Sequence, residues 1–226
     1  WHDGQVVYIV DYTPAVASAA PTPGASPPFT DTRGTAQTYQ TKMIGNQVWM
    51  TENFRYDGAG IANPDASGKY GRLYTWAEIQ DPSFAPPGWH VATDIEWRIL
   101  ERELGMLYTD AINGGQTTDQ STERGVAQTV GTQLKLGGTS GMDFLPAGSA
   151  SAGALSGDQG DKTYLWVNDL VSGTDPYRRK LVTDPIDGDP ASIYRFSNPV
   201  GTFAISVRLV KDNNIILEGD TRSVAV

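Results

Sequence analysis

Few side chains in this 226-residue chain are suited to nucleophilic or acid–base chemistry near neutral pH. The sequence has no cysteine and only two histidines, His2 and His90. The missing thiols exclude a disulfide framework, a cysteine–zinc cluster and a thiol nucleophile. A serine-type triad needs a histidine within reach of its nucleophile. His90 lies between turn residues and a helix start, so we expect it to be hydrogen-bonded at the edge of a core. We predict no catalytic residues and no enzymatic activity.

Two groups of oxygen-bearing side chains have the composition of a calcium site. Asp184, Asp187 and Asp189 place three carboxylates within six residues, which suits a hard cation but is also typical of a solvated turn. The segment 63–68 (NPDASG) is similar to the opening of a calcium loop. Tyr74 stands at its twelfth position, where such a loop needs a glutamate, and a turn is therefore the better interpretation. We predict no required cofactor, with calcium at the three aspartates as an open alternative.

The charge balance argues against two classes of partner. Asp and Glu number 26 against 17 Lys and Arg, a formal net charge of −9. Binding to nucleic acid relies on clustered basic residues, and the only such cluster, Tyr177–Lys180, is too small. The longest apolar run, Val6–Val10, is far shorter than the roughly 20 residues that span a bilayer. We therefore predict no nucleic-acid partner and no membrane span.

Local signals along the chain predict an α+β fold. Thr93 and Glu96 form a capping box, and the apolar spacing that follows predicts a helix over 94–104 that ends at Gly105. Gly45-Asn46 predicts a tight turn between strands over 37–44 and 47–50. Further strands are expected at 164–167, 193–196 and 202–210, with a weaker one at 215–217. The remaining pattern predicts at most two helices, short strands and long loops.

The first thirty residues differ in composition from the rest. Gln5–Tyr12 is rich in β-branched and aromatic residues and predicts a strand. Thr13–Phe29 is rich in Pro and Ala and predicts an extended spacer. We expect the arm 1–30 to contact an upstream domain or a neighbouring subunit, although its strand is equally suited to the edge of the main domain. The main domain is expected over 31–212, followed by a tail or extra strand over 213–226.

Several segments, taken in order, are similar to the motifs of one known family. They are Gln37–Asn53, Tyr70–Trp76, Pro86–Trp97, Phe144–Gly148, Tyr164–Trp166 and Phe203–Arg208. Together they resemble the Fibrobacter succinogenes major paralogous domain family, common in surface and secreted proteins of Bacteroidetes, over about residues 31–212. The resemblance implies a C-type-lectin-like fold, with few helices, short twisted antiparallel strands and long loops, which is shared with formylglycine-generating enzymes.

The chain departs from the family pattern in its cysteines. The family often has cysteines where this chain has Ala85 and Leu209, which is consistent with the loss of one disulfide as a pair. The catalytic cysteines of formylglycine-generating enzymes also have no counterpart, and this disfavours that activity. The calcium-dependent sugar-binding signatures of animal C-type lectins are absent as well.

The resemblance implies that ligands bind to long loops between late strands, over about residues 162–200. Aromatic, Arg and Asn side chains make adaptable recognition surfaces. The predicted ligand-binding residues are Trp166, Asn168, Tyr177, Arg178, Arg179, Tyr194, Arg195 and Asn198. Trp166 has a second interpretation as a core residue.

These expectations combine into a non-catalytic, adhesin-like binding module that works outside the cell or at the cell surface and recognises a glycan or a protein. The alternative is a phage fibre or decoration protein on the virion surface. In that case the N-terminal arm would dock to a neighbouring subunit.

Overall fold

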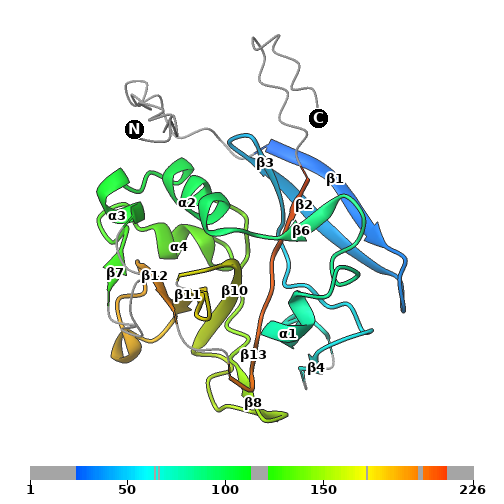
Figure 1. Cartoon of the computed structure of the whole chain (residues 1–226). Coiled ribbons are helices and arrows are strands. Elements are labelled where there is room, and N and C mark those ends of the chain that lie inside the picture. Colours follow the sequence, from blue (N-terminus) through cyan, green and yellow to red (C-terminus); the bar gives the residue numbers. More distant parts are fainter. Residues whose placement is uncertain are drawn as a thin grey trace, which may run out of the picture.

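A computed structural model describes residues 24–63, 65, 67–112, 122–171, 173–197 and 201–212. These residues form three antiparallel sheets with a few short helices, so the α+β class is confirmed (Figure 1). The first sheet has the order β1 (Gly24–Asp31), β2 (Gln37–Ile44), β3 (Gln47–Met50), β14 (Leu209–Lys211) and β6 (Trp89–Val91). The second has β10 (Lys162–Leu170), β11 (Pro176–Val182), β12 (Ile193–Ser197) and β7 (Glu123–Arg124). The third has β4 (Ile61–Ala62), β5 (Arg72–Thr75), β13 (Phe203–Ile205), β8 (Ala150–Ser151) and β9 (Ala154–Leu155).

The longest helix begins where its capping box predicts. In α2 (Asp94–Glu103) the Thr93 hydroxyl accepts from the Glu96 amide, and the Thr93 amide donates to the Glu96 carboxylate at 2.8 Å. Gly105 follows with φ +96°, a conformation that glycine adopts readily. Trp97 on the buried face packs against Trp49 of β3, with ring centroids 5.2 Å apart. The helix is therefore fixed to the first sheet.

The prediction of at most two helices is wrong. The described residues contain three further α-helices, α1 (Trp76–Ile79), α3 (Tyr108–Ile112) and α4 (Val130–Leu134), and the 3-10 helix η1 (Pro185–Asp187). Each has five residues or fewer, too short to show a helical repeat of apolar positions. A capping box at Thr75 and Glu78 marks the start of α1. Within the described part of the chain, no helix is long and apolar enough to cross a membrane.

The predicted spacer is wrong over its last six residues. Gly24–Phe29 belongs to β1, which pairs with β2 at the outer edge of the first sheet. Pro27 and Pro28 coincide with a register shift between Ser26 and Phe29. Proline lacks the amide that a central strand must donate, but an edge strand with an irregularity tolerates it. The proposed strand over Gln5–Tyr12 and the weaker strand over 215–217 lie outside the described residues.

The predicted strand over 202–210 is two strands of different sheets. β13 pairs with β5 and β8, whereas β14 pairs with β3 and β6. Between them the fully buried Arg208 donates to the Asn53 side chain at 2.9 Å and to the Met142 carbonyl at 2.8 Å. Its guanidinium stacks over Phe144 at 4.0 Å. This segment runs down the middle of the molecule and connects two sheets (Figure 1).

Candidate functional site

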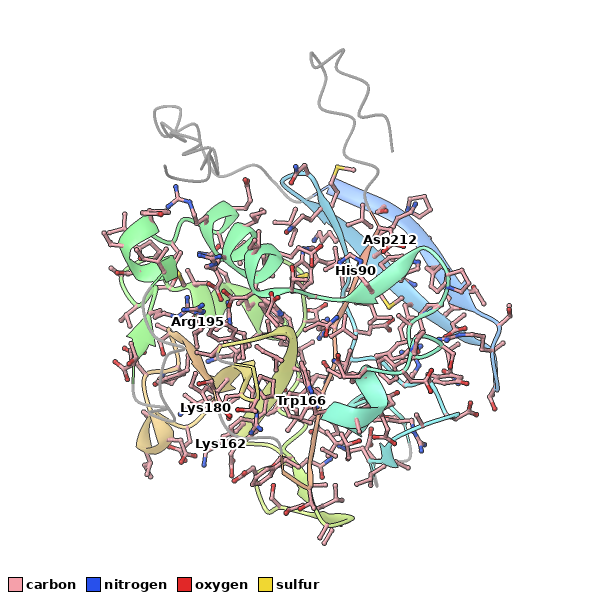
Figure 2. The ribbon with its side chains drawn as sticks, viewed as in Figure 1. His90, Lys162, Trp166, Lys180, Arg195 and Asp212 are labelled. Atoms are coloured by element: carbon pink, nitrogen blue, oxygen red, sulfur yellow. The ribbon has the colours of Figure 1, made fainter. Side chains whose placement is uncertain are left out.

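The predicted recognition residues of the late segment are mostly buried in strands. Tyr177, Arg178 and Arg179 lie on β11, and Tyr194 and Arg195 lie on β12. All but the half-buried Tyr177 have relative exposures of 5% or less. The expectation that they form an exposed loop surface is wrong, because β11 pairs with a neighbouring strand on each side. Figure 2 shows Lys180 and Arg195 among these strands.

Two of these arginines belong to a buried ion-pair network. Arg179 donates to Glu101 at 2.7 Å and to Asp94 at 3.0 Å, and Arg195 reaches both oxygens of Asp94 at 2.8 Å. Arg124 bonds both oxygens of Glu101, at 2.8 and 2.9 Å. Burial raises the pKa of Asp94, but Arg179 and Arg195 more than offset it, and the pKa falls to about 2. These arginines therefore hold α2 against the second sheet.

The remaining late residues also have internal partners. Arg178 lies over the Trp166 ring at 4.5 Å, and burial lowers the pKa of its guanidinium to about 10. Trp166 is 1% exposed and donates to the Tyr74 carbonyl at 2.7 Å, which confirms its core interpretation. The Tyr194 hydroxyl donates to Glu123 at 3.0 Å. Tyr177 lies under the guanidinium of Arg195 at 4.2 Å. Asn198 lies outside the described residues.

The three aspartates proposed for calcium do not converge. Asp184 accepts from the Ile186 amide at the start of η1, and Asp187 pairs with Lys162 at 2.8 Å. Asp189 accepts from the Ala191 amide at 2.7 Å. Among the residues that the structure describes, no group of three or more His, Cys, Asp or Glu side chains is placed to hold a metal ion. In the second candidate, Asp65 accepts from Ser67 and Lys69 as part of a turn.

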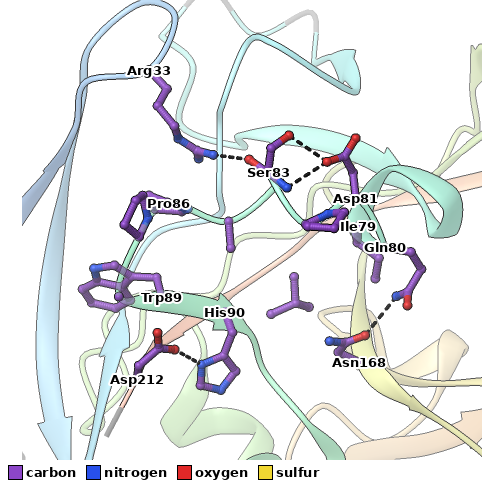
Figure 3. A pocket seen from close by; sticks show the side chains of 15 residues that line it. Arg33, Ile79, Gln80, Asp81, Ser83, Pro86, Trp89, His90, Asn168 and Asp212 are labelled. Atoms are coloured by element: carbon purple, nitrogen blue, oxygen red, sulfur yellow. Dashed lines mark hydrogen bonds and ion pairs between the residues drawn. The ribbon is translucent and has the colours of Figure 1, made fainter. Parts of the chain in front are cut away.

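An open groove of about 520 Å³ lies elsewhere, beside β6 (Figure 3). One wall is the segment that follows α1, the other is β6 with the turn before it, and Asn168 of β10 stands at one end. The lining residues are Arg33, Ile79–Ser83, Ala85–Val91, Asn168 and Asp212. Arg33 pairs with Asp31 at 2.8 Å and donates to the Phe84 carbonyl at 3.0 Å. It therefore connects the β1–β2 turn to the groove wall.

The polar side chains of the groove mostly bond to one another or to nearby backbone. The Gln80 amide donates to Asn168 at 2.9 Å. Asp81 accepts from the amide and the hydroxyl of Ser83 at 2.8 and 2.7 Å. Asp81 and Asp212 are both well exposed, and they give the groove two carboxylates that solvent and ligands can reach.

His90 is held between two carboxylates. Its Nε2 lies 2.7 Å from Glu96 and its Nδ1 lies 2.6 Å from Asp212, and Figure 3 draws the contact with Asp212. An ionised carboxylate only accepts, so both ring nitrogens must carry a proton. The bond to Glu96 is the largest cause that raises the pKa of His90, followed in the same direction by Asp212, to about 9 against the opposing effect of burial. The ring is therefore an imidazolium at neutral pH, as part of the hydrogen-bonded core edge expected from the sequence.

The strand beside the groove has a free edge. β6 is the last strand of its sheet, and Val210 of β14 lies opposite His90. The backbone amide of Asp212 donates to the Gly88 carbonyl at 2.8 Å, and the backbone amide of Ala92 donates to the Arg208 carbonyl at 3.3 Å. Antiparallel bonding alternates along a strand, so His90 faces β14 and the backbone groups of Trp89 and Val91 face away from it.

Three of these outward-facing groups are unbonded. The Trp89 amide donates to the Pro86 carbonyl at 3.0 Å. The Trp89 carbonyl and both the amide and the carbonyl of Val91 have no hydrogen-bond partner among the described residues. Both residues line the groove, and this free edge therefore borders it.

Comparison with models of known protein families shows to which family this chain belongs. The model of the Fibrobacter succinogenes major domain matches residues 43–211. The chain belongs to this family. No curated protein and no solved structure matches it. Every groove residue of this Fibrobacter succinogenes major domain except Arg33 and Asp212 falls inside the matched region.

Sequence reasoning found only part of the groove of this family member. Asn168 was predicted as a ligand-binding residue and does line the groove. Gln80, Asp81 and Asp212 were missed because they are polar residues in turns with no spacing that singles them out. The available signal was the Pro86–Gly88 turn before His90, which places a short strand directly after two prolines.

Proposed function

We propose that this chain is a non-catalytic binding domain whose groove takes an extended protein segment as an added strand on β6. The free backbone groups of Trp89 and Val91 carry this proposal. An extended peptide that lies along a sheet edge satisfies such groups and its own backbone together. Because Trp89 and Val91 are only 6% and 3% exposed, the peptide must enter the groove to reach them. Three such bonds are worth about 2–4 kcal/mol in total, which alone gives a dissociation constant near or above the millimolar range. Contacts of the ligand's side chains with the groove must therefore supply the remaining affinity.

The bonding of the groove's polar side chains favours a polypeptide over a glycan. A sugar ligand relies on side-chain donors and acceptors, but Gln80 and Asn168 are bonded to each other. Both nitrogens of His90 are also engaged. A glycan would have to break these pairs, whereas a strand adds bonds to backbone groups that have no partner in the part of the chain that the structure describes.

The charge of the groove favours a basic ligand side chain. Asp81 and Asp212 present exposed carboxylates, and Asp31 neutralises Arg33. Glu96 likewise offsets the charge of the His90 imidazolium, so the groove taken together with Asp31 and Glu96 carries an excess of negative charge. We therefore expect the bound segment to carry Lys or Arg next to apolar residues that contact Ile79 and Ala85.

The absence of catalysis in this proposal rests on the state of His90. A general base must be unprotonated at the working pH. The two carboxylates at 2.6 and 2.7 Å favour the protonated ring, which has no lone pair with which to accept a proton. A serine nucleophile beside it would remain unactivated.

We also propose where the domain works and which fold it has. Family resemblance supports a place at the cell surface or outside the cell. Pairing of the early hairpin β2–β3 with the late strand β14 supports the C-type-lectin-like fold, because the two ends of the domain meet in one sheet. A crystal structure compared with members of that fold tests the second point.

Val91 provides the decisive substitution. Val91→Pro removes the amide that faces the groove and leaves the bonds to β14 in place, since Val91 does not bond to β14. Val91→Ala is the matched control, because it also loses the branched side chain but keeps the amide. The probe is a displayed library of random 12-residue peptides, selected on the wild-type protein and then measured individually by fluorescence anisotropy.

We expect selected peptides to bind at least 10-fold more weakly to Val91→Pro than to Val91→Ala. Circular dichroism and thermal unfolding check that both variants are folded. A glycan array runs in parallel on the same three proteins. Saccharide binding without peptide binding, or peptide binding that Val91→Pro leaves unchanged, would refute strand addition at β6.

A further inference from the structure

A second surface, on α2 and α3, carries an inference independent of the groove. Ile95 and Tyr108 are 60% and 63% exposed, and Ile112 is 43% exposed. With Ile99 and Ala111 they line a shallow apolar hollow whose only charged lining residues are Arg98 and Arg102. We call this set of seven residues the α2–α3 patch. Several large apolar side chains exposed side by side mark an interaction site on a protein of this size.

We propose that the α2–α3 patch is covered by the segment Asp3–Tyr12 of the same chain. The sequence of this segment is apolar over Val6–Val10 and carries Asp3 and Asp11 on either side of that run. Its composition therefore matches the patch chiefly in its apolar residues, which suit the isoleucines. Its two carboxylates are opposite in charge to Arg102 and to Arg98, which also pairs with Asp94 of its own helix at 3.2 Å. The segment Thr13–Phe29, which follows it, offers few residues that could compete for the same apolar surface.

The point at which the chain enters the described structure supports this occupant. Gly24 lies opposite Met43 in the β1–β2 register, two residues before Gly45. A Cβ atom at Gly45 would lie 2.8 Å from side-chain atoms of Glu103, the last residue of α2. The chain therefore enters beside the C-terminal end of the helix that carries the patch.

The length of the linker is sufficient. The eleven residues between Tyr12 and Gly24 span up to about 36 Å when extended. α2 has ten residues and is about 15 Å long. The segment can therefore reach every residue of the α2–α3 patch without a second copy of the chain.

Hydrogen–deuterium exchange on the full chain tests the proposal. We expect amides of residues 5–12 to exchange at least 10-fold more slowly than in a free peptide of the same sequence. Ile95→Asp should abolish this protection, because it places a carboxylate in the apolar hollow next to incoming Asp side chains. The substitution lies in the first turn of α2, where a carboxylate favours the helix. Ile186→Asp, at an isoleucine that is 90% exposed on η1, is the matched control and should leave the protection unchanged.

Four results would overturn the assignment. Residues 5–12 that exchange as fast as the free peptide exclude docking of this segment. If Ile95→Asp does not change the protection of residues 5–12, the segment docks elsewhere. If residues 113–121 are protected and Ile95→Asp removes that protection, the neighbouring segment 113–121 covers the patch. The protein concentration is also raised from 1 to 100 μM, on the order of typical homodimer dissociation constants. If residues 5–12 become protected only when a dimer forms, a second copy of the chain covers the patch.

Discussion

The contact of His90 with Glu96 and Asp212 makes the stability of this domain depend on pH in a predictable direction. The pKa of His90 is raised from 6.5 to about 9, chiefly by the bond to Glu96. The folded state therefore holds a proton that the unfolded chain releases at lower pH. The resulting stabilisation is fully present below pH 6.5 and is lost as the pH rises through about 9.

The size of the effect follows from the shift and the exposure of the groups. A rise of the pKa from 6.5 to about 9 corresponds to about 3 kcal/mol, because one pKa unit is worth about 1.4 kcal/mol. His90 is one-third exposed and Asp212 is 56% exposed, so solvent screening reduces this figure. We expect about 1–2 kcal/mol of stabilisation at pH 6.

The assay is urea unfolding of the wild type and of His90→Gln at pH 6, 7.5 and 9.5. Glutamine keeps hydrogen-bonding ability but cannot acquire the charge. The difference in free energy of unfolding should be about 1–2 kcal/mol at pH 6 and should approach zero at pH 9.5. Taking the difference between the two proteins cancels the titration of groups they share. A difference that stays constant across this range would show that His90 is not an imidazolium in the folded protein.

Three further predictions concern the stability of the fold and the three aspartates of segment 184–189. Glu101→Ala should lower the free energy of unfolding by about 3–5 kcal/mol, because it leaves Arg124 and Arg179 buried without their carboxylate; a loss below 1 kcal/mol in chemical denaturation would contradict this. Gly71→Ala should cost more than Gly68→Ala, by about 1–3 kcal/mol, since both have positive φ but a Cβ atom at Gly71 would lie 2.7 Å from the backbone carbonyl oxygen of Phe54, whereas one at Gly68 would meet nothing; equal melting temperatures would be the contrary result. Added calcium should leave the melting temperature unchanged within error, because the three aspartates of segment 184–189 have separate partners; calorimetry would reveal any binding.

The features predicted correctly from the sequence are those that neighbouring residues determine. The capping box of Thr93 and Glu96 and the turn at Gly45-Asn46 each need only a few consecutive side chains. Helix and hairpin therefore form where the sequence indicates. Strands over 164–167 and 193–196 were located correctly for the same reason.

The burial of the late arginines was not predictable in this way. Arg178, Arg179 and Arg195 look like surface residues because charged side chains are almost never buried without a partner. The partners of Arg179 and Arg195 lie far away in the sequence, with Asp94 separated from Arg195 by 101 residues. Only the packing of α2 against the second sheet brings them together.

The groove was missed because it is assembled from separate segments. Arg33, Asn168 and Asp212 come from three distant parts of the chain, and the main walls come from residues 79–91. The free edge of β6 depends on which strand pairs with it on one side and on the lack, among the described strands, of one that pairs with it on the other. Neither property can be predicted from the residues of β6 alone.

The buried arginines also change the balance of charges that a partner meets when it touches the protein surface. Among the described residues, six cations (Arg124, Arg178, Arg179, Lys180, Arg195 and Arg208) and three carboxylates (Asp31, Asp94 and Glu101) are buried, which leaves the interior with a formal charge of +3. Because the formal net charge of the whole chain is −9, all the other residues together carry a formal charge of −12. A partner in contact with the surface therefore meets more carboxylates than the composition implies, whereas at long range the net charge of −9 repels anionic polymers and anionic lipid surfaces. A basic partner approaches faster at low ionic strength than at high.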